Sequence, residues 1–242
     1  MTKLSVNINK IALVRNTRDL DIPNIIESAQ IVISAGAYGI TVHPRPDQRH
    51  IRYSDVYDLA KILRVEFNIE GNPFLGRFME VVRDVKPTQA TLVPDEHGAS
   101  TSDHGWDLKN EKRPLKELIA EMKQLGIRVS LFMDPDKKAI ELAKKIDADR
   151  IELYTEPYAR AFRLNENLKQ SIEEYAVAGE FALELGLGLN AGHDLNLDNL
   201  GTFLKNVRGV DEVSIGHALI ADALKMGLYN AVKEYCKVLQ EC

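Results

Sequence analysis

The architecture is first indicated by the segment Ala35-Gly36-Ala37-Tyr38-Gly39-Ile40-Thr41-Val42, in which a helical pattern ends, a glycine follows and a short apolar strand begins. The same order returns in residues 125–131 and 185–189. The first glycine of each copy stands where a helix is expected to stop, because glycine readily adopts the left-handed conformation of a helix C-terminus. The sequence therefore predicts a repeating unit in which a helix leads into a strand.

Eight short apolar segments are predicted as strands, and segments of helical periodicity separate them. The predicted strands are residues 4–9, 38–43, 65–70, 88–93, 127–133, 150–155, 187–190 and 212–215. Strands that alternate with helices imply parallel pairing with right-handed crossovers. Eight units in about 240 residues is the count of a closed barrel. We therefore expect an α/β fold, a (β/α)8 TIM barrel with extra helical segments in the βα loops, as a single domain over residues 1–242.

An open, doubly wound sheet is the competing architecture. It usually carries a glycine-rich G-x-G-x-x-G loop after an early strand, and this sequence has none. Two connections are too long for plain turns, namely residues 94–112 and residues 156–165. Long loops in compact domains are usually lids or binding segments. In a barrel both would lie at the C-terminal rim, where active sites are found.

Helix starts are predicted at two Asx-Pro pairs. Asn72-Pro73 and Asp134-Pro135 each have the pattern of an N-cap followed by proline in the first helical position. For Asp134, this capping role is the plainer alternative to a catalytic one.

Composition excludes several classes of protein. The chain has 242 residues, 45% of them hydrophobic and 28% charged, with a net charge of −5. Such a surface does not favour nucleic acid or an anionic membrane. The two cysteines, Cys236 and Cys242, provide neither a disulfide framework nor a Cys-based zinc site. With no apolar signal core near residue 1 and no stretch of roughly 20 apolar residues, we expect a cytoplasmic protein.

Polar side chains stand at or just beyond the predicted strand ends, and a barrel would bring them to one pocket. They are Asn7, Asn9, Lys10, His43, Arg45, Arg49, His50, Glu70, Thr101, His104, Asp134, Glu152, His193, Asp194 and His217. Histidines and a glutamate in a partly dry pocket suit acid–base chemistry on a carbonyl compound. The basic segment from Arg45 to His50 suits a phosphate ester. Glycines beside the last two strands, Gly192 and Gly216, let backbone N–H groups approach an anion.

The motifs at these strand ends match a known family along the whole chain. The matching segments are residues 6–12, 15–18, 39–51, 68–70, 92–94, 129–132, 151–155, 190–193 and 215–218. The most specific are the segment that begins Gly39-Ile40-Thr41-Val42-His43-Pro44-Arg45 and the segment Asn190-Ala191-Gly192-His193. Together they resemble the pyridoxine 5′-phosphate synthases.

The resemblance implies a ring-forming condensation. The family joins 1-deoxy-D-xylulose 5-phosphate to 3-amino-2-oxopropyl phosphate and releases phosphate and water, without a metal or organic cofactor. It also implies a homo-octamer whose lid after the fourth strand closes over the substrates.

The resemblance also implies a role for each matching residue. His43 and Glu70 correspond to general bases, His193 to the general acid and Glu152 to a group that stabilises a transition state. The residues that would hold the amino-ketone phosphate are Asn7, Arg18, Gly216 and His217. Those that would hold the deoxyxylulose phosphate are Arg45, His50 and Thr101.

The chain departs from the family pattern in two places. Asn9-Lys10 stands where the family has Asp-His, and we expect this pair to contact the deoxyxylulose phosphate, with Lys10 as a cationic donor. Asp194 stands where the family has glycine. A carboxylate beside a phosphate is unfavourable, so we expect its backbone N–H to face the ligand and its side chain to turn away.

Two other functions fit the same residues. In a metal-dependent phosphosugar epimerase or aldolase, His43, Glu70, Glu152 and His193 would ligate a divalent ion. An aldolase of the imine-forming kind would instead use a lysine, for which Lys10 is the strand-end candidate. A catalytically idle barrel that binds a sugar phosphate is the third reading, although such a module does not need three proton carriers.

Overall fold

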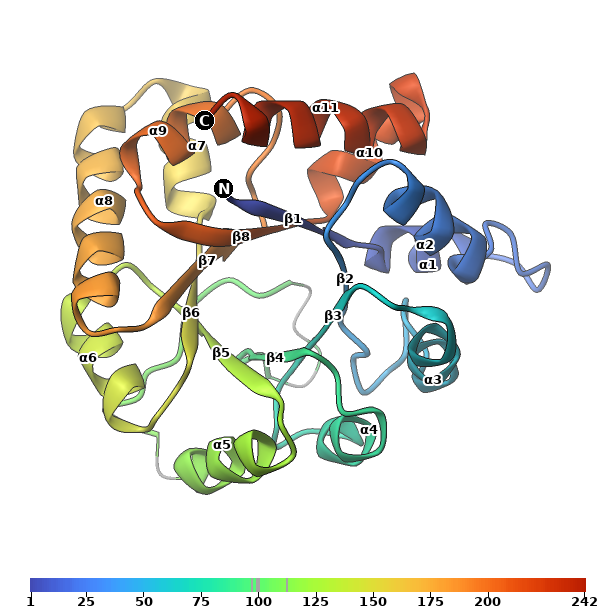
Figure 1. The fold of residues 1–242 in the computed structure, drawn as a ribbon, viewed down its shortest axis with the longest axis horizontal. Helices are drawn as coiled ribbons and strands as arrows, with labels where there is room; N and C mark the ends of the chain where they lie inside the picture. Colours follow the sequence, from blue (N-terminus) through green and yellow to red (C-terminus); the bar gives the residue numbers. More distant parts are fainter. Residues whose placement is uncertain (97, 99–100, 112) are drawn as a thin grey trace.

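Eight parallel strands close into a barrel in the computed structural model, which describes residues 1–96, 98, 101–111 and 113–242. Figure 1 looks along this barrel. The strands are β1 (Lys3–Asn7), β2 (Gly39–Val42), β3 (Glu66–Gly71), β4 (Gln89–Leu92), β5 (Arg128–Met133), β6 (Arg150–Leu153), β7 (Gly188–Gly192) and β8 (Val210–Ile215). Each strand pairs with the next, and β8 closes the ring on β1, with Ile215 opposite Val6. All eight predicted strands are confirmed.

Helices surround the barrel (Figure 1). Those that connect successive strands or follow the last one are α2 (Ile25–Ser34), α3 (Tyr53–Ile62), α4 (Phe78–Val85), α5 (Leu115–Gln124), α6 (Lys137–Lys145), α8 (Leu168–Glu184), α9 (Leu200–Asn206) and α11 (Leu228–Gln240). Additional helices directly follow β1, β6 and β8: they are α1 (Asn9–Arg15), α7 (Glu156–Leu164) and α10 (His217–Met226). The predicted extra helical segments are therefore present.

Residues 156–165 were expected to form a long loop, and this expectation is wrong, because they form α7 and its C-cap. Tertiary packing stabilises the helix. The Tyr158 ring is buried against Tyr175 and Phe203, with centroids 6.1 and 5.1 Å away, and its hydroxyl donates to the carbonyl of Asn199 at 2.7 Å.

The predicted helix ends are confirmed and two predicted helix starts are wrong. Gly36, Gly126 and Gly186 follow α2, α5 and α8 with φ of +104°, +80° and +69°. By contrast, Asn72 accepts from the backbone N–H of Phe74 in a turn, and α4 begins only at Phe78. The α6 N-cap is Asp136, whereas Asp134 accepts from the backbone N–H of Gly105 in the loop after β4.

The two faces of each strand differ in polarity. Apolar residues at alternating positions are fully buried against the helices, as Val6, Ile40 and Ile69 illustrate. The other positions carry polar side chains that bond to one another across strands: Thr91 Oγ1, for example, donates to Asn68 Oδ1 at 3.0 Å. Barrel interiors are usually filled by branched apolar residues. Here the interior is polar, and this polar column leads to the cavity at its C-terminal end.

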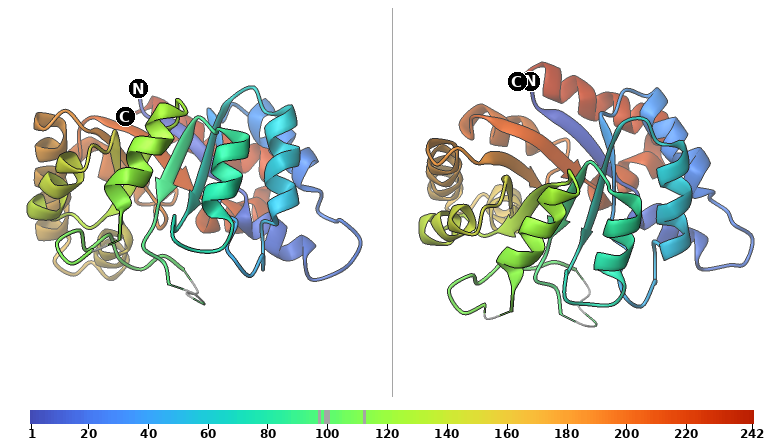
Figure 2. Two further views of the ribbon diagram at one scale, coloured as in Figure 1. Left: turned by 90° about the horizontal axis from the view of Figure 1, so that it is seen from below. Right: turned by 60° about the horizontal axis from the view of Figure 1, so that its bottom comes forward.

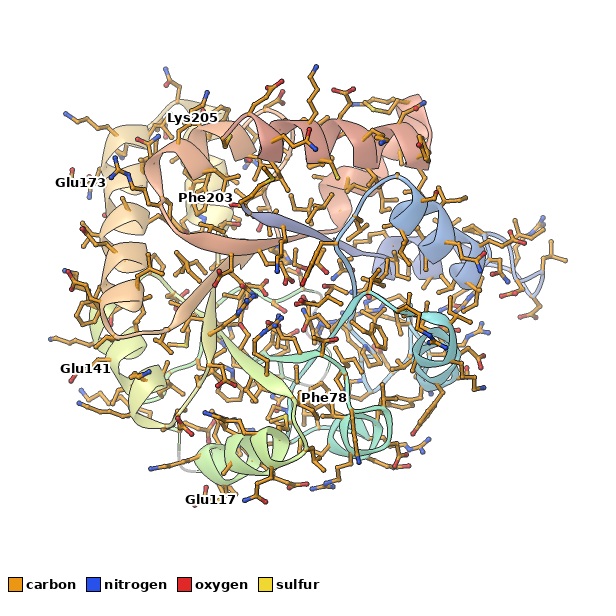
Figure 3. The ribbon with its side chains drawn as sticks, in the orientation of Figure 1. Phe78, Glu117, Glu141, Glu173, Phe203 and Lys205 are labelled. Atoms are coloured by element: carbon orange, nitrogen blue, oxygen red, sulfur yellow. The ribbon has the colours of Figure 1, made fainter. Side chains whose placement is uncertain are left out.

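The surface and the ends of the barrel are distinct. Glu117, Glu141 and Glu173 project outward from α5, α6 and α8, and Phe203 is buried under α9 (Figure 3). Both chain termini lie at the end of the barrel opposite the loop after β4 (Figure 2). Among the described residues, no helix has the length and apolar character needed to cross a membrane.

Candidate active site

A cavity of about 300 Å³ opens at the C-terminal ends of the strands. Its lining consists of Asn7, Asn9, Lys10, His43, Arg45, His50, Glu70, Val93, Thr101, Ser102, Phe132, Glu152, His193, Asp194, Ser214, Gly216 and His217. The fold thus brings most of the predicted site residues together, but Arg49, His104, Asp134 and Gly192 do not line this cavity, and neither does Arg18. The Arg18 side chain is exposed in the turn after α1.

Glu70 lies at the centre of a polar cluster drawn from four strand ends. Its Oε2 accepts from Asn7 Nδ2 at 3.3 Å and lies 3.9 Å from His43 Nδ1, while its Oε1 accepts from Ser214 Oγ at 3.5 Å. Burial raises the pKa of Glu70 to about 7, although the positive charges of His193 and Arg45 oppose the increase. A carboxyl group with this pKa can both take and return a proton near neutrality.

His43 is a buried, neutral imidazole. It follows β2, and its backbone N–H donates to Asn9 Oδ1 at 2.9 Å. This hydrogen bond holds the backbone of His43 in place beside the cavity. Burial lowers the pKa of His43 well below its ordinary value, and the positive charge of Arg45 lowers it further. The neighbouring His50 has a pKa of about 4 for the same two reasons. A neutral His43 can accept a proton but cannot donate one from a cationic form.

The pKa of His193 is shifted in the opposite direction, upward. His193 follows β7 directly, with Nδ1 2.6 Å from Asp194 Oδ2 and Nε2 2.7 Å from Thr101 Oγ1. Burial alone would lower the pKa of His193, but the hydrogen bond and charge of Asp194, together with the negative charges of Glu70 and Asp95, raise it overall. The pKa values of two imidazoles in one cavity are therefore shifted in opposite directions, which is the pattern of a base and an acid.

Glu152 is 3% exposed and lines the same cavity as His43 and His193. Burial raises its pKa well above the ordinary value, and the negative charges of Glu70 and Glu212 add to the effect. Its Oε2 has no hydrogen-bond partner among the described residues. A buried glutamate often pairs with an arginine, but Arg150 of the same strand is directed elsewhere: it donates to Asn190 and lies near Asp211 and Glu212. A neutral Glu152 can donate a hydrogen bond into the cavity.

Arg45 supplies a buried positive charge at the rim. Its Nη2 lies 2.6 Å from Asp95 Oδ2, and Ser102 Oγ donates to the same oxygen at 2.9 Å. Asp95, which belongs to the loop after β4, thus connects this loop to the segment after β2 that carries Arg45. That loop is also anchored by Trp106, whose Nε1 donates to the carbonyl of Leu92 at 2.9 Å. Residues 97, 99, 100 and 112 of the predicted lid lie outside the described residues.

A family model described as "Pyridoxal phosphate biosynthesis protein PdxJ" matches residues 4–241, nearly the whole chain. The chain belongs to the PdxJ family. Relatives named pyridoxine 5′-phosphate synthase include those of Christiangramia forsetii, 54% identical over 99% of this chain and 100% of the relative, and Cytophaga hutchinsonii, 53% identical over 100% of both. The relative from Bacteroides thetaiotaomicron is 52% identical over 99% of this chain and 100% of its own length.

Distant solved structures share the fold of this PdxJ protein. A phosphoribosyl anthranilate isomerase from Thermotoga maritima aligns with a TM-score of 0.62 at 14% identity and covers 100% of both chains. A thiamine phosphate pyrophosphorylase from Pyrococcus furiosus aligns with a TM-score of 0.61 at 18% identity over 99% of this chain and 96% of its own. At such low identity these matches support the barrel alone.

The departures from the PdxJ pattern have visible consequences. The side chain of Asn9 accepts a hydrogen bond from the backbone N–H of His43. Lys10 is half-buried and lines the cavity. The Asp194 carboxylate is turned onto the His193 ring. The backbone N–H of Asp194, expected to face the ligand, instead donates to the carbonyl of Gly192 at 2.9 Å.

Three polar residues of this PdxJ site were missed from the sequence: Asp95, Ser102 and Ser214. Asp95 lies just beyond the fourth strand, so the strand-end rule that found the others could have found it. Ser214 lies inside β8, two residues before the glycine that was identified, and strand alternation could have pointed to it. Ser102 had no such signal, because its position depends on the path of a long loop.

Within the described ranges, no group of three or more His, Cys, Asp or Glu side chains is placed to hold a metal ion.

Proposed function

We propose that this chain is a pyridoxine 5′-phosphate synthase, which condenses 1-deoxy-D-xylulose 5-phosphate with 3-amino-2-oxopropyl phosphate to form pyridoxine 5′-phosphate, phosphate and water. The observation that carries the proposal is the set of proton carriers in one cavity: a neutral His43, a Glu70 with a pKa of about 7 and a His193 with a raised pKa. Imine formation, dehydration and aromatisation need several proton transfers in sequence, and these groups suit them.

Each carrier has a role that fits its environment. His43 and Glu70 act as general bases, since one is neutral and the other titrates near neutrality. His193 acts as general acid. Glu152, kept neutral by burial, donates a hydrogen bond to the oxygen that gains charge in a transition state.

The two phosphate groups need two anion sites. The deoxyxylulose phosphate would be held by Arg45, His50, Thr101, Asn9 and Lys10, which all line the cavity. Asn7 and the turn at Gly216 and His217, which begins α10, would hold the amino-ketone phosphate. The loop carrying Thr101 and Ser102 keeps water from reactive imines when both substrates are bound.

Arg18 fits this scheme only in an oligomer. Its side chain is exposed outside its own cavity. In the homo-octamer that we propose for the cytoplasmic enzyme, Arg18 reaches the amino-ketone phosphate in the cavity of a neighbouring copy. Mixing Arg18→Ala and Glu70→Gln subunits should then restore activity, because a mixed assembly contains cavities with both groups. Mixed assemblies no more active than the separate variants would contradict this arrangement.

The direct test is to incubate the purified protein with both phosphorylated ketones and to detect pyridoxine 5′-phosphate by chromatography and mass spectrometry. The metal-dependent alternative is tested in the same experiment by measuring metal content and by adding a chelator. Formation of product without loss on chelation supports the synthase, and tight binding of both substrates without turnover would support the idle barrel.

A further inference from the structure

The ring of His193 is held from both sides. Its Nδ1 lies 2.6 Å from Asp194 Oδ2, and its Nε2 lies 2.7 Å from Thr101 Oγ1. The backbone contributes, since His193 has φ of +64°, in the left-handed region that non-glycine residues seldom adopt. Such conformations persist where surrounding contacts hold them in place, often at functional sites.

The Asp194 contact decides which ring nitrogen carries a proton. An ionised carboxylate only accepts hydrogen bonds, so Nδ1 must be the donor toward Asp194 in both charge states of the ring. Nε2 is therefore the atom that exchanges a proton with anything bound in the cavity. A negative charge at hydrogen-bond distance also stabilises the imidazolium relative to the neutral ring.

Other charged groups face the ring from neighbouring elements. Glu70 reaches it from β3 and Asp95 from the loop after β4, and both favour its protonated form. His43 lines the same cavity, and the Tyr154 ring packs edge-on against His193 with 6.3 Å between centroids. Among these acidic groups, Asp194 is the one that bonds to the ring itself. Removing its charge should therefore have a large and specific effect on His193.

We propose that Asp194 is a positioning residue that orients His193 and keeps its ring protonated for use as the general acid, rather than a ligand of a substrate phosphate. The assignment of His193 as an acid rests on the proposed function, whereas the pairing itself does not. It also explains how an acidic side chain is accommodated beside an anion site, because its charge faces an imidazolium.

The first test measures the protonation of His193 without any turnover. Diethyl pyrocarbonate acylates only neutral imidazole, so the pH dependence of modification at His193, followed by peptide mass spectrometry, gives its pKa. In Asp194→Asn the midpoint should fall by about one unit or more. Asp194→Gly should lower the midpoint as well, whereas Asp194→Glu should bring it most of the way back to the wild-type value. Asp198→Asn, an equal charge change on the same loop, should leave the midpoint unchanged. A midpoint that stays constant in both neutral variants overturns the proposal.

The second test connects this pairing to the reaction. The alkaline limb of the pH profile of kcat/KM should move down with the modification midpoint in Asp194→Asn, with little change in KM for the amino-ketone phosphate. A KM increase with an unmoved limb would overturn the positioning role and restore Asp194 as a ligand. A shifted modification midpoint in a protein that forms no product would contradict the proposed function while leaving the pairing intact.

Discussion

His43 and His193 are the same residue type in the same cavity, yet their pKa values are shifted in opposite directions. His43 is buried among positive charges, which disfavour its protonated form. His193 is bonded to a carboxylate and faces two more, which favour it. At the scale of single residues, function therefore depends on the neighbours of each group more than on its chemical type.

Replacing Glu70 by glutamine should remove a proton acceptor while preserving shape. We expect Glu70→Gln to lower kcat by about 10²- to 10⁴-fold, the usual contribution of general acid–base catalysis, with both substrates still bound. Steady-state product formation and calorimetric titration measure the two effects. Glu180→Gln, on the exposed surface of α8, is the matched control. Full turnover by the Glu70 variant would remove this residue from the mechanism.

The pH dependence of kcat/KM should form a bell. Glu70 must lose its proton to act as a base, so the rate rises with pH through its pKa of about 7. His193 must keep its proton to act as an acid, so the rate falls again above its raised pKa. Because Glu70 and His193 interact, the pKa values read from the two limbs of the bell belong to the pair and not to either residue alone. A profile that keeps rising to pH 10 would contradict the role of His193.

At the scale of elements, close approach of β7 and β8 places the site. A Cβ added at Gly192 would lie 2.3 Å from the carbonyl oxygen of Ser214 and 3.2 Å from Glu152 Oε1. The last residue of β7 must therefore be glycine for His193, Glu152 and β8 to meet in one cavity. The helix-end glycines, by contrast, serve chain reversal outside the barrel.

Substitution of Gly192 should consequently disturb both strands. We expect Gly192→Ala to lower the free energy of unfolding by about 1–3 kcal/mol, the usual cost of overpacking, because the obstacle is backbone and cannot rotate away. Urea denaturation measures this. Gly201→Ala in α9 is the control, since the nearest atom to its added Cβ is 3.7 Å away. Equal stability of the Gly192 variant and the wild type would show that β7 can shift freely.

At the scale of the whole molecule, the polar barrel interior links the site to the opposite end. There Glu66 pairs with Arg128, and Glu212 lies 3.7 Å from Arg150 Nη1. Burial and the neighbouring Glu66 carboxylate raise the pKa of Glu212 to about 9. The folded protein thus keeps a proton on Glu212 at neutral pH, which the unfolded chain would release.

This difference makes stability depend on pH. The contribution of Glu212 is complete below its unfolded pKa, near the ordinary 4.5, and is lost as the pH rises toward the folded value of about 9. We expect Glu212→Gln, which cannot ionise, to reduce the fall in the urea midpoint between pH 6 and pH 9. Glu234→Gln on the exposed surface of α11 should leave that fall as in the wild type. An identical fall in the Glu212 variant would show that this carboxyl group does not titrate there.

The eight strands, the closed barrel and most of the residues that meet at its rim could be predicted from the sequence. These features follow from local patterns: apolar runs, helix-end glycines and polar residues at strand ends. The tertiary structure alone decided that residues 156–165 form a helix, that Arg18 lies outside the cavity and that Asp194 pairs with His193. It also decided which imidazole has a lowered pKa and which has a raised one. Burial and the distances between charges depend on residues far apart in the chain, which no local pattern encodes.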